Sequence, residues 1–554
     1  MLTDHMNELT PEEGLVFVPL GGAGEIGMNL NLYGYNDQWI MIDLGVTFQD
    51  QCGVQVVAPD PKFIEENKDN LHALILTHAH EDHVGAIPYL WSRLRCPIYA
   101  TPFTMEIVKN KLTEAGIIGQ VELHTIPLGG QIELGDFKIQ YVHLTHSIPE
   151  PNGLLIETPL GRIFHTGDWK IDPHPVIGNE MDVPALKKIG DEGVLAMVCD
   201  STNVFELGNA GSEQNVREAL IDLVKKQKNR VVITCFASNI ARLDSCIEAA
   251  KQSGRFVVFV GRSMDTMINA ATDTNYFSHI PHRISIEKAA DLPRDQVLYV
   301  CTGSQGEAKA ALKRIARNSY PNIRLDKGDV VIFSSRRIPG NEERISEVKN
   351  DLVRSGVTIL DHKESLIHVS GHPFRDDLQK MYEWIRPKIA VPIHGEYQHL
   401  MEHGRFAKEE CGVKKVIIPE NGSFVILGPD EPQIVERVHH GYLGNDGHDM
   451  IDMYGSIIRD RQKLSINGVV FASLHWDQDK HKILDVQVSS RGVIEIGIES
   501  QNFEQNMAEK IFEFVKNNKK LASHHLEEEV RLLIRRQINR LRGIKPLVII
   551  HNHD

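Results

Sequence analysis

The chain has 554 residues, which is too long for one ordinary hydrophobic core and indicates about two to four domains. Apolar residues make up 42% and charged residues 24%, with no biased tract, which excludes collagen, coiled coil and wholesale disorder. The 60 Lys and Arg against 75 Asp and Glu give a net charge of −15. This charge argues against a simple basic nucleic-acid coat but is compatible with a local basic channel.

The first residues, MLTDHMNELTPEEG, carry acids and no apolar core, so no signal peptide is expected. No apolar run approaches the roughly 18 residues of a membrane span. The seven cysteines are scattered and never in C-x-x-C spacing, which argues against a disulfide framework and against a thiolate zinc site. We therefore expect a cytoplasmic protein without membrane contact.

The region from residue 14 to about residue 166 is predicted to be rich in strands. Its apolar stretches, separated by Gly, Asn and Asp turns, are LVFVPL, MNLNLYGY, QWIMIDLG, LHALILTH, FKIQYVHL and the hairpin LLIETPLGRIFHTG. Their β-branched and aromatic residues are typical of buried strands. From residue 212 onward, helical stretches such as GSEQNVREALIDLVKKQ alternate with apolar strands such as RVVITCFAS. This alternation predicts βαβ units and a parallel sheet.

The last third of the chain begins with further strands and helices and then changes character. Residues 435–460, rich in Gly, Asp and His, are predicted to form a linker. Strands GVVFASLHW and KILDVQVSS and two long helices follow. Apolar residues at helical spacing give the second helix one apolar face: Val530, Leu533, Ile534, Ile538 and Leu541. This face packs on its own domain or on a partner subunit, and RNA contact by the helix arginines is the alternative.

A glycine pattern near the amino terminus suggests a nucleotide site but lacks its context. Gly22, Gly24 and Gly27 in GGAGEIG match G-x-G-x-x-G, and Asp43 follows at the distance of a ribose-binding acid. The third glycine should open a helix, whereas MNLNLYGYN alternates like a strand. We interpret these glycines as tight turns at the rim of a site and expect no dinucleotide.

The strongest functional signal is the string THAHEDH at residues 77–83, directly after the apolar strand LHALIL. Its imidazoles and carboxylate lie at a strand-to-helix turn, where they can converge as a regular helix or strand period would not allow. A turn lets His78 and His80 bind one ion while Asp82 and His83 reach a second. A solvated histidine-rich loop is the alternative.

The pattern H-x-H-x-D-H resembles the signature of the metallo-β-lactamase superfamily, and HLTHS and HTGDW follow in the same order. The resemblance implies two divalent ions with these ligands: His78, His80 and His146 for the first, Asp82 and His83 for the second, and Asp168 for both. Asp43 would accept the outer N–H of a ligating histidine. Imidazole and carboxylate suit zinc first, with manganese as the alternative, and two such ions can activate a water.

The chain continues far beyond Asp168, whereas small-molecule members of the superfamily need little beyond the first domain. A large α/β insertion before a final histidine ligand is similar to the β-CASP nucleases, whose inserted domain closes over a nucleic-acid strand. Asp200 in VCDST, the segment HVSGH at residues 368–372 and His394 in VPIHGEY match that group. By this resemblance His394 completes the second metal site.

Within that group the chain resembles the ribonuclease J family over nearly its whole length, in blocks such as GGAGEIGMN, THAHEDHVGAIP, CTGSQGE, SSRRIPGNE and PIHGEYQHL. Trp169 and Ala79 depart from the family pattern without removing a ligand. The implied fold class is α/β, a metallo-β-lactamase αββα sandwich with an inserted β-CASP α/β domain and a small α+β C-terminal domain. The expected boundaries are 1–205 and 366–440 for the sandwich, 206–365 for the insert, 441–462 for the linker and 463–554 for the C-terminal domain.

The activity implied by this resemblance is 5′-to-3′ exonucleolysis of single-stranded RNA from a 5′-monophosphate, with endonucleolysis as a further activity, in RNA decay and maturation including rRNA processing. A homodimer or homotetramer through the C-terminal domain is also implied. Two other interpretations stay open. One is a β-CASP nuclease that acts on DNA or in 3′-end processing, and the other is a non-catalytic RNA-binding subunit, against which the complete ligand set argues.

The segment HVSGH supplies the remaining candidate residues. His372, oriented by Asp200, is the first candidate for the general acid that protonates the leaving 3′-oxygen, and His368 is the second. Ser370 and Gly371, with His368 and His372, could instead bind a 5′-phosphate, and a structural polar loop is the alternative. Phe48 is a candidate for stacking a terminal base, with a core position as the alternative.

Overall fold

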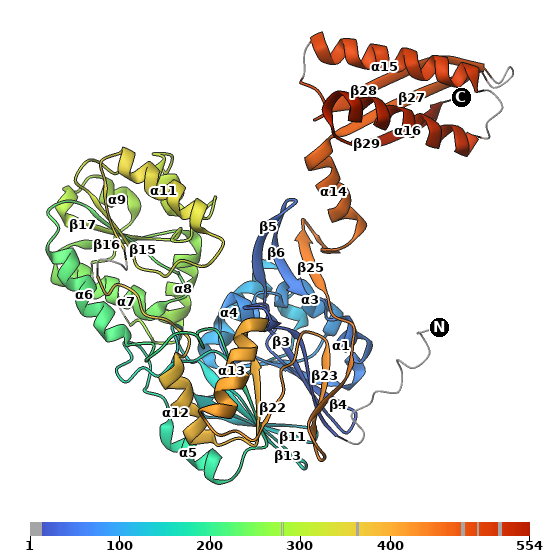
Figure 1. Cartoon of the computed structure of the whole chain (residues 1–554). Coiled ribbons are helices and arrows are strands. Elements are labelled where there is room, and N and C mark those ends of the chain that lie inside the picture. Colours follow the sequence, from blue (N-terminus) through green and yellow to red (C-terminus); the bar gives the residue numbers. More distant parts are fainter. Residues whose placement is uncertain are drawn as a thin grey trace. The chain divides into compact units, whose positions relative to one another are not determined.

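The computed structural model describes residues 14–278, 280, 282–361, 365–477, 482–495, 498–518 and 523–553. The stretch that we read for a signal peptide lies outside the described residues, apart from Gly14. The chain forms two compact units, one of Met1–Thr47 with Val57–Gly441 and the other of Phe48–Val56 with Tyr442–Asp554 (Figure 1). Among the described residues, none of the helices combines the length and apolar character that crossing a membrane requires.

The first unit is built on a sandwich of two sheets. The strands of the first sheet lie in the order β24 (Gln433–Arg437), β23 (Ser423–Gly428), β1 (Leu15–Gly21), β3 (Leu30–Tyr35), β4 (Gln38–Ile42), β7 (Leu71–Ile75), β8 (Ile98–Ala100) and β9 (Leu123–Thr125). Those of the second lie in the order β10 (Gln131–Leu134), β11 (Phe137–His143), β12 (Asn152–Thr158), β13 (Gly161–His165), β14 (Ala196–Asp200), β20 (Ile389–Ile393) and β22 (Lys415–Val416).

The sandwich core lies between the inner faces of these sheets. Phe17, Tyr33 and Ile75 of the first sheet pack with Phe137 and Val198 of the second, and all are fully buried. Strand alternation directs every second side chain inward, which gives each sheet an apolar face. Helices flank the sheets: α1 (Lys62–Glu66), α3 (Ile87–Leu94), α4 (Pro102–Glu114), α5 (Val183–Asp191), α12 (Arg375–Ile385) and α13 (Tyr397–Glu409). The predicted αββα sandwich is confirmed.

The predicted parallel sheet forms the centre of the inserted module. Its strands lie in the order β16 (Phe256–Val260), β17 (Val297–Cys301), β15 (Val231–Thr234), β18 (Val330–Phe333) and β19 (Thr358–Leu360), all parallel. The helices between them are α6 (Glu213–Lys225), α7 (Ile240–Gln252), α8 (Arg262–Asp273), α9 (Ile286–Ala290), α10 (Ala311–Ala316) and α11 (Glu342–Arg354). The module leaves the sandwich after β14 and returns before β20, although these two strands are paired neighbours.

The second unit contains part of the segment that we predicted to be a linker. Residues 441–462 fold into β25 (Tyr442–Asp446), β26 (Asp449–Asp452) and the start of α14 (Ser456–Asn467). The order of that sheet is β26, β25, β6 (Val54–Pro59) and β5 (Thr47–Gln51). Its strands β5 and β6 come from the amino-terminal part of the chain, which a reading of local sequence could not connect with residues 442–452.

The C-terminal residues form a sheet in the order β28 (Lys482–Arg491), β27 (Val469–Asp477) and β29 (Leu547–His553), with α15 (Ile498–Asn517) and α16 (Ser523–Arg542). Val530, Ile534 and Ile538 of α16 are fully buried in a core with the strands, so the helix packs on its own domain. Leu541, predicted to share this apolar face, is 64% exposed and does not join that core. It lies in the last turn of α16, beyond the residues that reach the sheet.

Candidate metal centre

The candidate site lies where strands of both sheets end. Asp43 follows β4, His78 follows β7, Asp168 follows β13, Asp200 ends β14 and His394 follows β20. Neighbouring parallel strands present their carboxyl ends at one edge, so residues far apart in the sequence meet there. All five side chains are buried.

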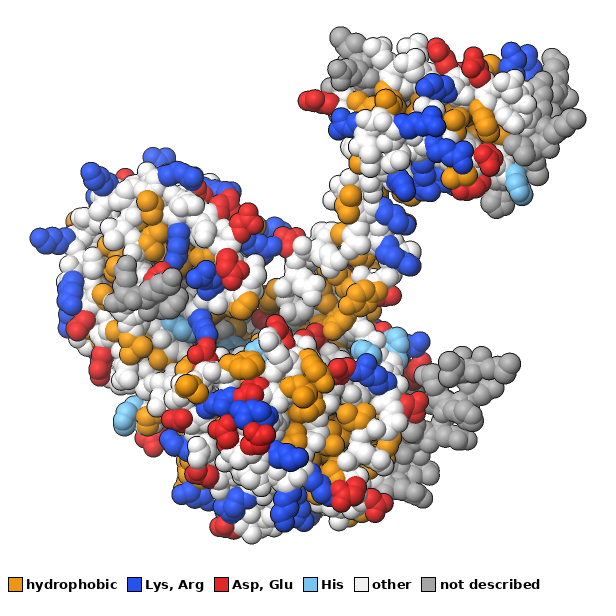
Figure 2. Space-filling model, viewed as in Figure 1, with side chains coloured by type: hydrophobic (Ala, Val, Ile, Leu, Met, Phe, Trp, Pro, Cys, Tyr) orange, Lys and Arg blue, Asp and Glu red, His pale blue; other side chains and the backbone are white. Residues whose placement is uncertain are grey.

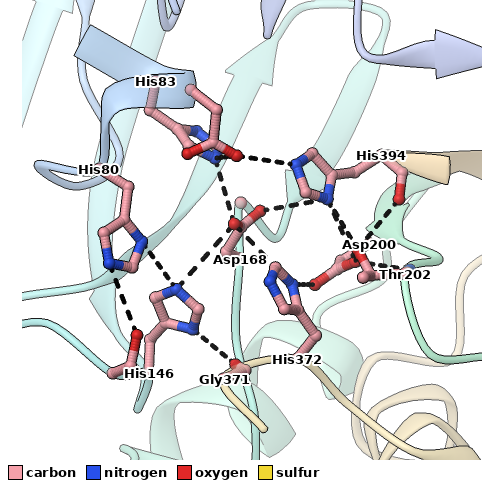
Figure 3. A network of polar contacts seen from close by, with 12 residues as sticks. His80, His83, His146, Asp168, Asp200, Thr202, Gly371, His372 and His394 are labelled. Carbon is pink, nitrogen blue, oxygen red and sulfur yellow. Dashed lines mark hydrogen bonds and ion pairs between the residues drawn. The ribbon is translucent and has the colours of Figure 1, made fainter. Parts of the chain in front are cut away.

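A first cluster brings together His78, His80, His146 and Asp168, whose ligand atoms lie within 4.8 Å of one another. His80 Nδ1 lies 3.1 Å from His78 Nε2. It also lies 3.0 Å from His146 Nε2 (Figure 3). Burial and the neighbouring imidazoles hold the pKa of His78 and of His146 well below the ordinary value, and burial lowers the pKa of His80 to about 4. Three neutral nitrogens facing one another at this distance form a donor set that fits a cation.

A second cluster joins Asp82, His83, Asp168 and His394. His83 Nε2 lies 3.2 Å from Asp168 Oδ2, and His394 Nε2 lies 3.3 Å from Asp82 Oδ2. Burial alone would raise the pKa of Asp82 and Asp168, but the imidazoles His83 and His394 outweigh it and keep both carboxylates ionised. Two carboxylates and two imidazoles fit zinc or manganese. The seven predicted ligands thus lie in two groups that share Asp168.

Asp43 lies behind the second cluster and holds one of its rings. Its Oδ2 accepts from His83 Nδ1 at 2.7 Å, and its two carboxylate oxygens accept from the backbone N–H and the hydroxyl of Thr77, both at 2.8 Å. The first contact fixes the His83 tautomer that directs Nε2 toward Asp168. Asp43 (φ 63°) and His394 (φ 52°) both adopt the left-handed backbone conformation, which costs about 1–3 kcal/mol each and is typical of functional sites.

Two further residues orient candidate ligands, and neither role was predicted from the sequence. Thr202 Oγ1 lies 2.8 Å from His394 Nδ1 and donates to Asp200 Oδ1 at 2.7 Å. The carbonyl of Gly371 accepts from His146 Nδ1 at 2.5 Å. The position of Thr202 in VCDST could have suggested its role, whereas a backbone carbonyl such as that of Gly371 leaves no signal in the sequence.

His372 lies at the edge of the second cluster, paired with Asp200. Its Nδ1 is 2.8 Å from Asp200 Oδ2, and its ring stacks on His394 with centroids 5.5 Å apart. Burial would lower the pKa of His372, but Asp200 and Asp168 outweigh it and raise the pKa above the ordinary value. The side chain is 22% exposed, so the ring is accessible beside the two clusters.

The other residues of HVSGH lie next to His372 in the chain and make polar contacts of their own. Ser370 Oγ accepts from Asn203 Nδ2 at 2.8 Å and from the backbone N–H of His372 at 3.2 Å. Arg336, from SSRRIPGNE, reaches Asn203 Oδ1 at 3.4 Å and pairs with Glu206. His368 is half-buried at the start of this segment.

Phe48 lies on β5 in the other unit and is 66% exposed. This exposure rules out the alternative that Phe48 is a core residue. Its contact with a terminal base remains a prediction.

The glycines of GGAGEIG lie at the rim of the site, and the segment that follows them is the strand β3, where a dinucleotide site would need a helix. Gly22 (φ 84°) accepts the backbone N–H of His394 on its carbonyl at 2.6 Å. Gly27 (φ 90°) lies beside Asp82, since a Cβ there would be 3.5 Å from the Asp82 Cβ. The interpretation as rim turns is confirmed.

Comparison with known proteins separates the chain into matched regions. Four family models match: Beta-lactamase superfamily domain over residues 38–186, Ribonuclease J, beta-CASP domain over 228–352, Zn-dependent metallo-hydrolase RNA specificity domain over 356–419, and Ribonuclease J C-terminal domain over 456–554.

Similar proteins cover almost the whole chain. Ribonuclease J of Sinorhizobium meliloti is 40% identical over 98% of this chain and 98% of its own length. Ribonuclease J 1 of Streptococcus pyogenes is 36% identical over 88% and 87%, and Ribonuclease J of Thermus thermophilus is 32% identical over 97% and 95%. A solved structure of a protein of unknown function from Enterococcus faecalis has a TM-score of 0.53 at 17% identity, covering 74% of this chain and 100% of that one, which shows a shared fold.

Proposed function

Because the chain belongs to the ribonuclease J family and is a metal-dependent ribonuclease, we propose that it degrades single-stranded RNA from the 5′ end, prefers a 5′-monophosphate, and also cleaves internally. The observation that carries the proposal is the place of HVSGH. The Gly371 carbonyl binds a ligand of the first cluster, and the His372 ring stacks on a ligand of the second. A strand end bound by this segment would therefore present its scissile phosphodiester to both clusters.

The metal complement that fits the site is two divalent ions, zinc first and manganese as the alternative. His78, His80 and His146 would hold one ion, Asp82, His83 and His394 the other, and Asp168 both. When bound, such a pair activates a water and offsets the negative charge that builds up at the phosphodiester. The donation of His146 Nδ1 to Gly371 and of His83 Nδ1 to Asp43 leaves each Nε2 lone pair directed at the cluster.

His372 is the general acid in this proposal. Its Nδ1 binds Asp200, which leaves Nε2 to donate a proton to the leaving 3′-oxygen. The carboxylates of Asp200 and Asp168 outweigh burial and raise the pKa of His372 above its ordinary value, which favours the protonated form that a general acid needs. His368, the second candidate from the sequence, is assigned instead to the binding of the strand end.

The 5′-phosphate pocket consists of the Ser370 hydroxyl, the backbone at Gly371 and the two histidines of HVSGH. Asn203 donates to Ser370 Oγ, which leaves the Ser370 proton free to donate to a phosphate oxygen. Arg336 reaches Asn203 from the inserted module and adds a cation at this edge. A fixed strand end beside the metals accounts for 5′-to-3′ polarity.

The charge distribution agrees with local binding of RNA. Lys, Arg, Asp and Glu side chains are interspersed over the face of the first unit seen in Figure 2. We therefore assign RNA affinity to the site itself. From the family likeness we place the reaction in the cytoplasm, in RNA decay and maturation. The homodimer or homotetramer expected from the C-terminal domain is a separate prediction, which light scattering of the purified chain tests.

The test compares one RNA sequence with a 5′-monophosphate, a 5′-triphosphate or a 5′-hydroxyl, and the same sequence as single-stranded DNA, each with and without added zinc or manganese. We expect metal-dependent release of nucleotides from the 5′-monophosphorylated RNA to be fastest. Equal rates on DNA would support the rival nuclease class, and absence of cleavage on every substrate would support a non-catalytic subunit.

Replacement of Ser370 isolates the pocket from the metals. Ser370→Ala should reduce the preference for a 5′-monophosphate over a 5′-hydroxyl by about tenfold, since one charge-assisted hydrogen bond is lost. Metal content should not change. Ser253→Ala, which removes a hydroxyl bonded within α7 of the inserted module, is the control. Equal preference in Ser370→Ala and the parent would rule out the pocket.

A further inference from the structure

A series of buried charged side chains connects the metal-ligand loops with the inserted module. Lys170, two residues after Asp168, is fully buried, and its Nζ lies 3.2 Å from Asp172 Oδ2. Lys170 also donates from its backbone N–H to the carbonyl of Thr145, the neighbour of His146. Asp172 Oδ2 accepts the backbone N–H of Glu213, the first residue of α6. The series therefore starts beside ligands of the first cluster and ends inside the insert.

Arg242 of α7 continues this series with a fully buried guanidinium. Its Nη2 lies 3.0 and 3.1 Å from the carboxylate oxygens of Glu213. Its Nη1 donates to the carbonyl of Ser334 at 2.7 Å and to the carbonyl of Ile367 at 3.0 Å. One planar group is thus shared between the start of α6, the end of β18 and the segment that returns to the sandwich.

The contact with Ile367 is significant because His368 is the next residue. The Ile367 carbonyl accepts a second hydrogen bond from Ser334 Oγ at 2.7 Å, so its position is fixed from two directions. The outgoing and returning segments also touch, since a Cβ at Gly211 would lie 3.0 Å from the Val369 side chain. Arg242 therefore links the segment that enters the insert with the segment that returns to the sandwich, at the start of HVSGH.

Stability alone does not require an ion pair at this place. Well-packed apolar residues of similar volume often replace a buried pair with equal or better stability. An apolar pair could not, however, donate to the carbonyl of Ile367. Arg242 supplies a link between Glu213 of α6 and the carbonyl of residue 367 that an apolar pair would lack.

We propose that Arg242 is a positioning residue for the reaction: through the Ile367 carbonyl it sets where Ser370 and His372 lie relative to the metal centre. The inference rests on the proposed roles of those two residues. By this inference the inserted module, besides any contact with RNA, holds the 5′-phosphate pocket at a fixed position relative to the metal ligands.

The test must separate positioning from folding. Arg242→Met alone leaves the Glu213 carboxylate buried without its cation, which destabilises the fold. The paired variant Arg242→Met with Glu213→Met removes both charges and retains the Glu213 backbone contact with Asp172. Arg242→Lys keeps a cation beside Glu213 but cannot reach Glu213, Ser334 and Ile367 together.

We expect the paired full-length variant, loaded with metal, to keep the parent's metal content and a cooperative thermal transition. Its kcat on 5′-monophosphorylated RNA should fall by roughly 10- to 100-fold, the range expected when reacting groups shift by up to about 1 Å. The rate ratio between 5′-monophosphorylated and 5′-hydroxyl RNA should approach one. Arg242→Lys should show the same loss in the ratio, because charge alone does not restore the contact.

The control is Arg255→Met. Arg255 is also buried in the insert, and within the described part of the chain it donates to the carbonyls of Gln227, Asn229 and Val297. It should lower the melting temperature and leave the ratio unchanged.

A paired variant with the parent's kcat and ratio would overturn the inference, as would a parental ratio in Arg242→Lys. A parent enzyme without any 5′-monophosphate preference would instead contradict the proposed pocket. In that case the role of Arg242 is decided by the kcat of internal cleavage, which the paired variant should still lower.

Discussion

The two candidate metal clusters differ in charge and in the way the chain assembles them. The first contains three imidazoles and one carboxylate, and all its members precede the inserted module in the sequence. The second contains two imidazoles and two carboxylates, and one of its members, His394, follows the insert. The first cluster also depends on a residue beyond the insert, but only through the Gly371 carbonyl that orients His146.

This difference shows how an insertion can control a site without contributing a ligand to it. Both clusters require that the chain return from the insert in the correct position, the first for the orientation of a ring and the second for a ligand. We therefore expect the first cluster to tolerate changes in the returning segment better than the second.

The largest expected effect comes from removal of one ligand from either cluster. His80→Ala and Asp82→Ala should each lower RNA cleavage at least about 1000-fold, because the two ions act together on one phosphodiester. The thermal transition should persist, since neither residue belongs to the sandwich core. His124→Ala, at an exposed histidine paired with Glu122, is the control. Unchanged turnover in either ligand variant would contradict the mechanism.

Removal of His394 tests the asymmetry directly. His394→Ala should reduce bound metal from two ions to one per chain, as measured by mass spectrometry of the elements in the dialysed protein. The first cluster should keep its ion, because its own ligands are unchanged. Loss of both ions would show that the clusters are inseparable, and retention of both would remove His394 from the ligand set.

The outer contacts should give a smaller effect, at a different cluster in each variant. Thr202→Val removes the partner of His394 Nδ1, and Gly371→Ala places a methyl group 2.6 Å from His146 Cε1. Each substitution should lower the binding affinity for one ion by about 10- to 100-fold, as is typical when a contact that orients a metal ligand is lost. Competition with a chelator measures both affinities. If both variants lowered the affinity for the same ion, the two clusters would not be oriented separately as we infer.

A pH dependence of stability, with no change in the ligands, is expected from a buried histidine outside both clusters. His403 is fully buried between Ser201 Oγ at 2.8 Å and the Tyr382 hydroxyl at 2.9 Å, and burial lowers its pKa to about 4. The unfolded chain takes up this proton first, so the free energy of unfolding should fall by up to about 3 kcal/mol as pH drops from 6.5 to 4. His403→Gln should flatten this dependence in urea titrations. An equal slope in both proteins would show that His403 does not contribute.

Local patterns predicted the strand-rich and α/β regions and the metal character of residues 77–83, whereas the full ligand set and the sandwich with its insert were predicted from the family resemblance. The string at residues 77–83 places its ligands in one turn, and the later motifs end strands, where an α/β protein carries its sites. The strand character of MNLNLYGYN also distinguished rim glycines from a nucleotide-binding loop.

The features that sequence reasoning missed depend on contacts between distant segments. The Gly371 carbonyl is a backbone atom, and Arg242 in NIARLDSC has the sequence context of any surface arginine on a helix. The predicted linker forms strands because residues 442–452 pair with each other and join β6, which is far away in the chain. Such long-range pairing is invisible to local composition.

Because the insert interrupts the sandwich, it affects the order in which the parts of this protein can fold during translation. Strand β14 waits for its neighbour β20 through roughly 190 further residues, which takes about 10–40 s at bacterial elongation rates of about 5–20 residues per second. Strand β1 waits even longer for β23. The inserted sheet, whose strands are consecutive, can mature during that delay. The nascent chain can thus fold the inserted module before the sandwich that carries the site is complete. Nuclease activity cannot appear until translation has passed both closing strands, β20 and β23.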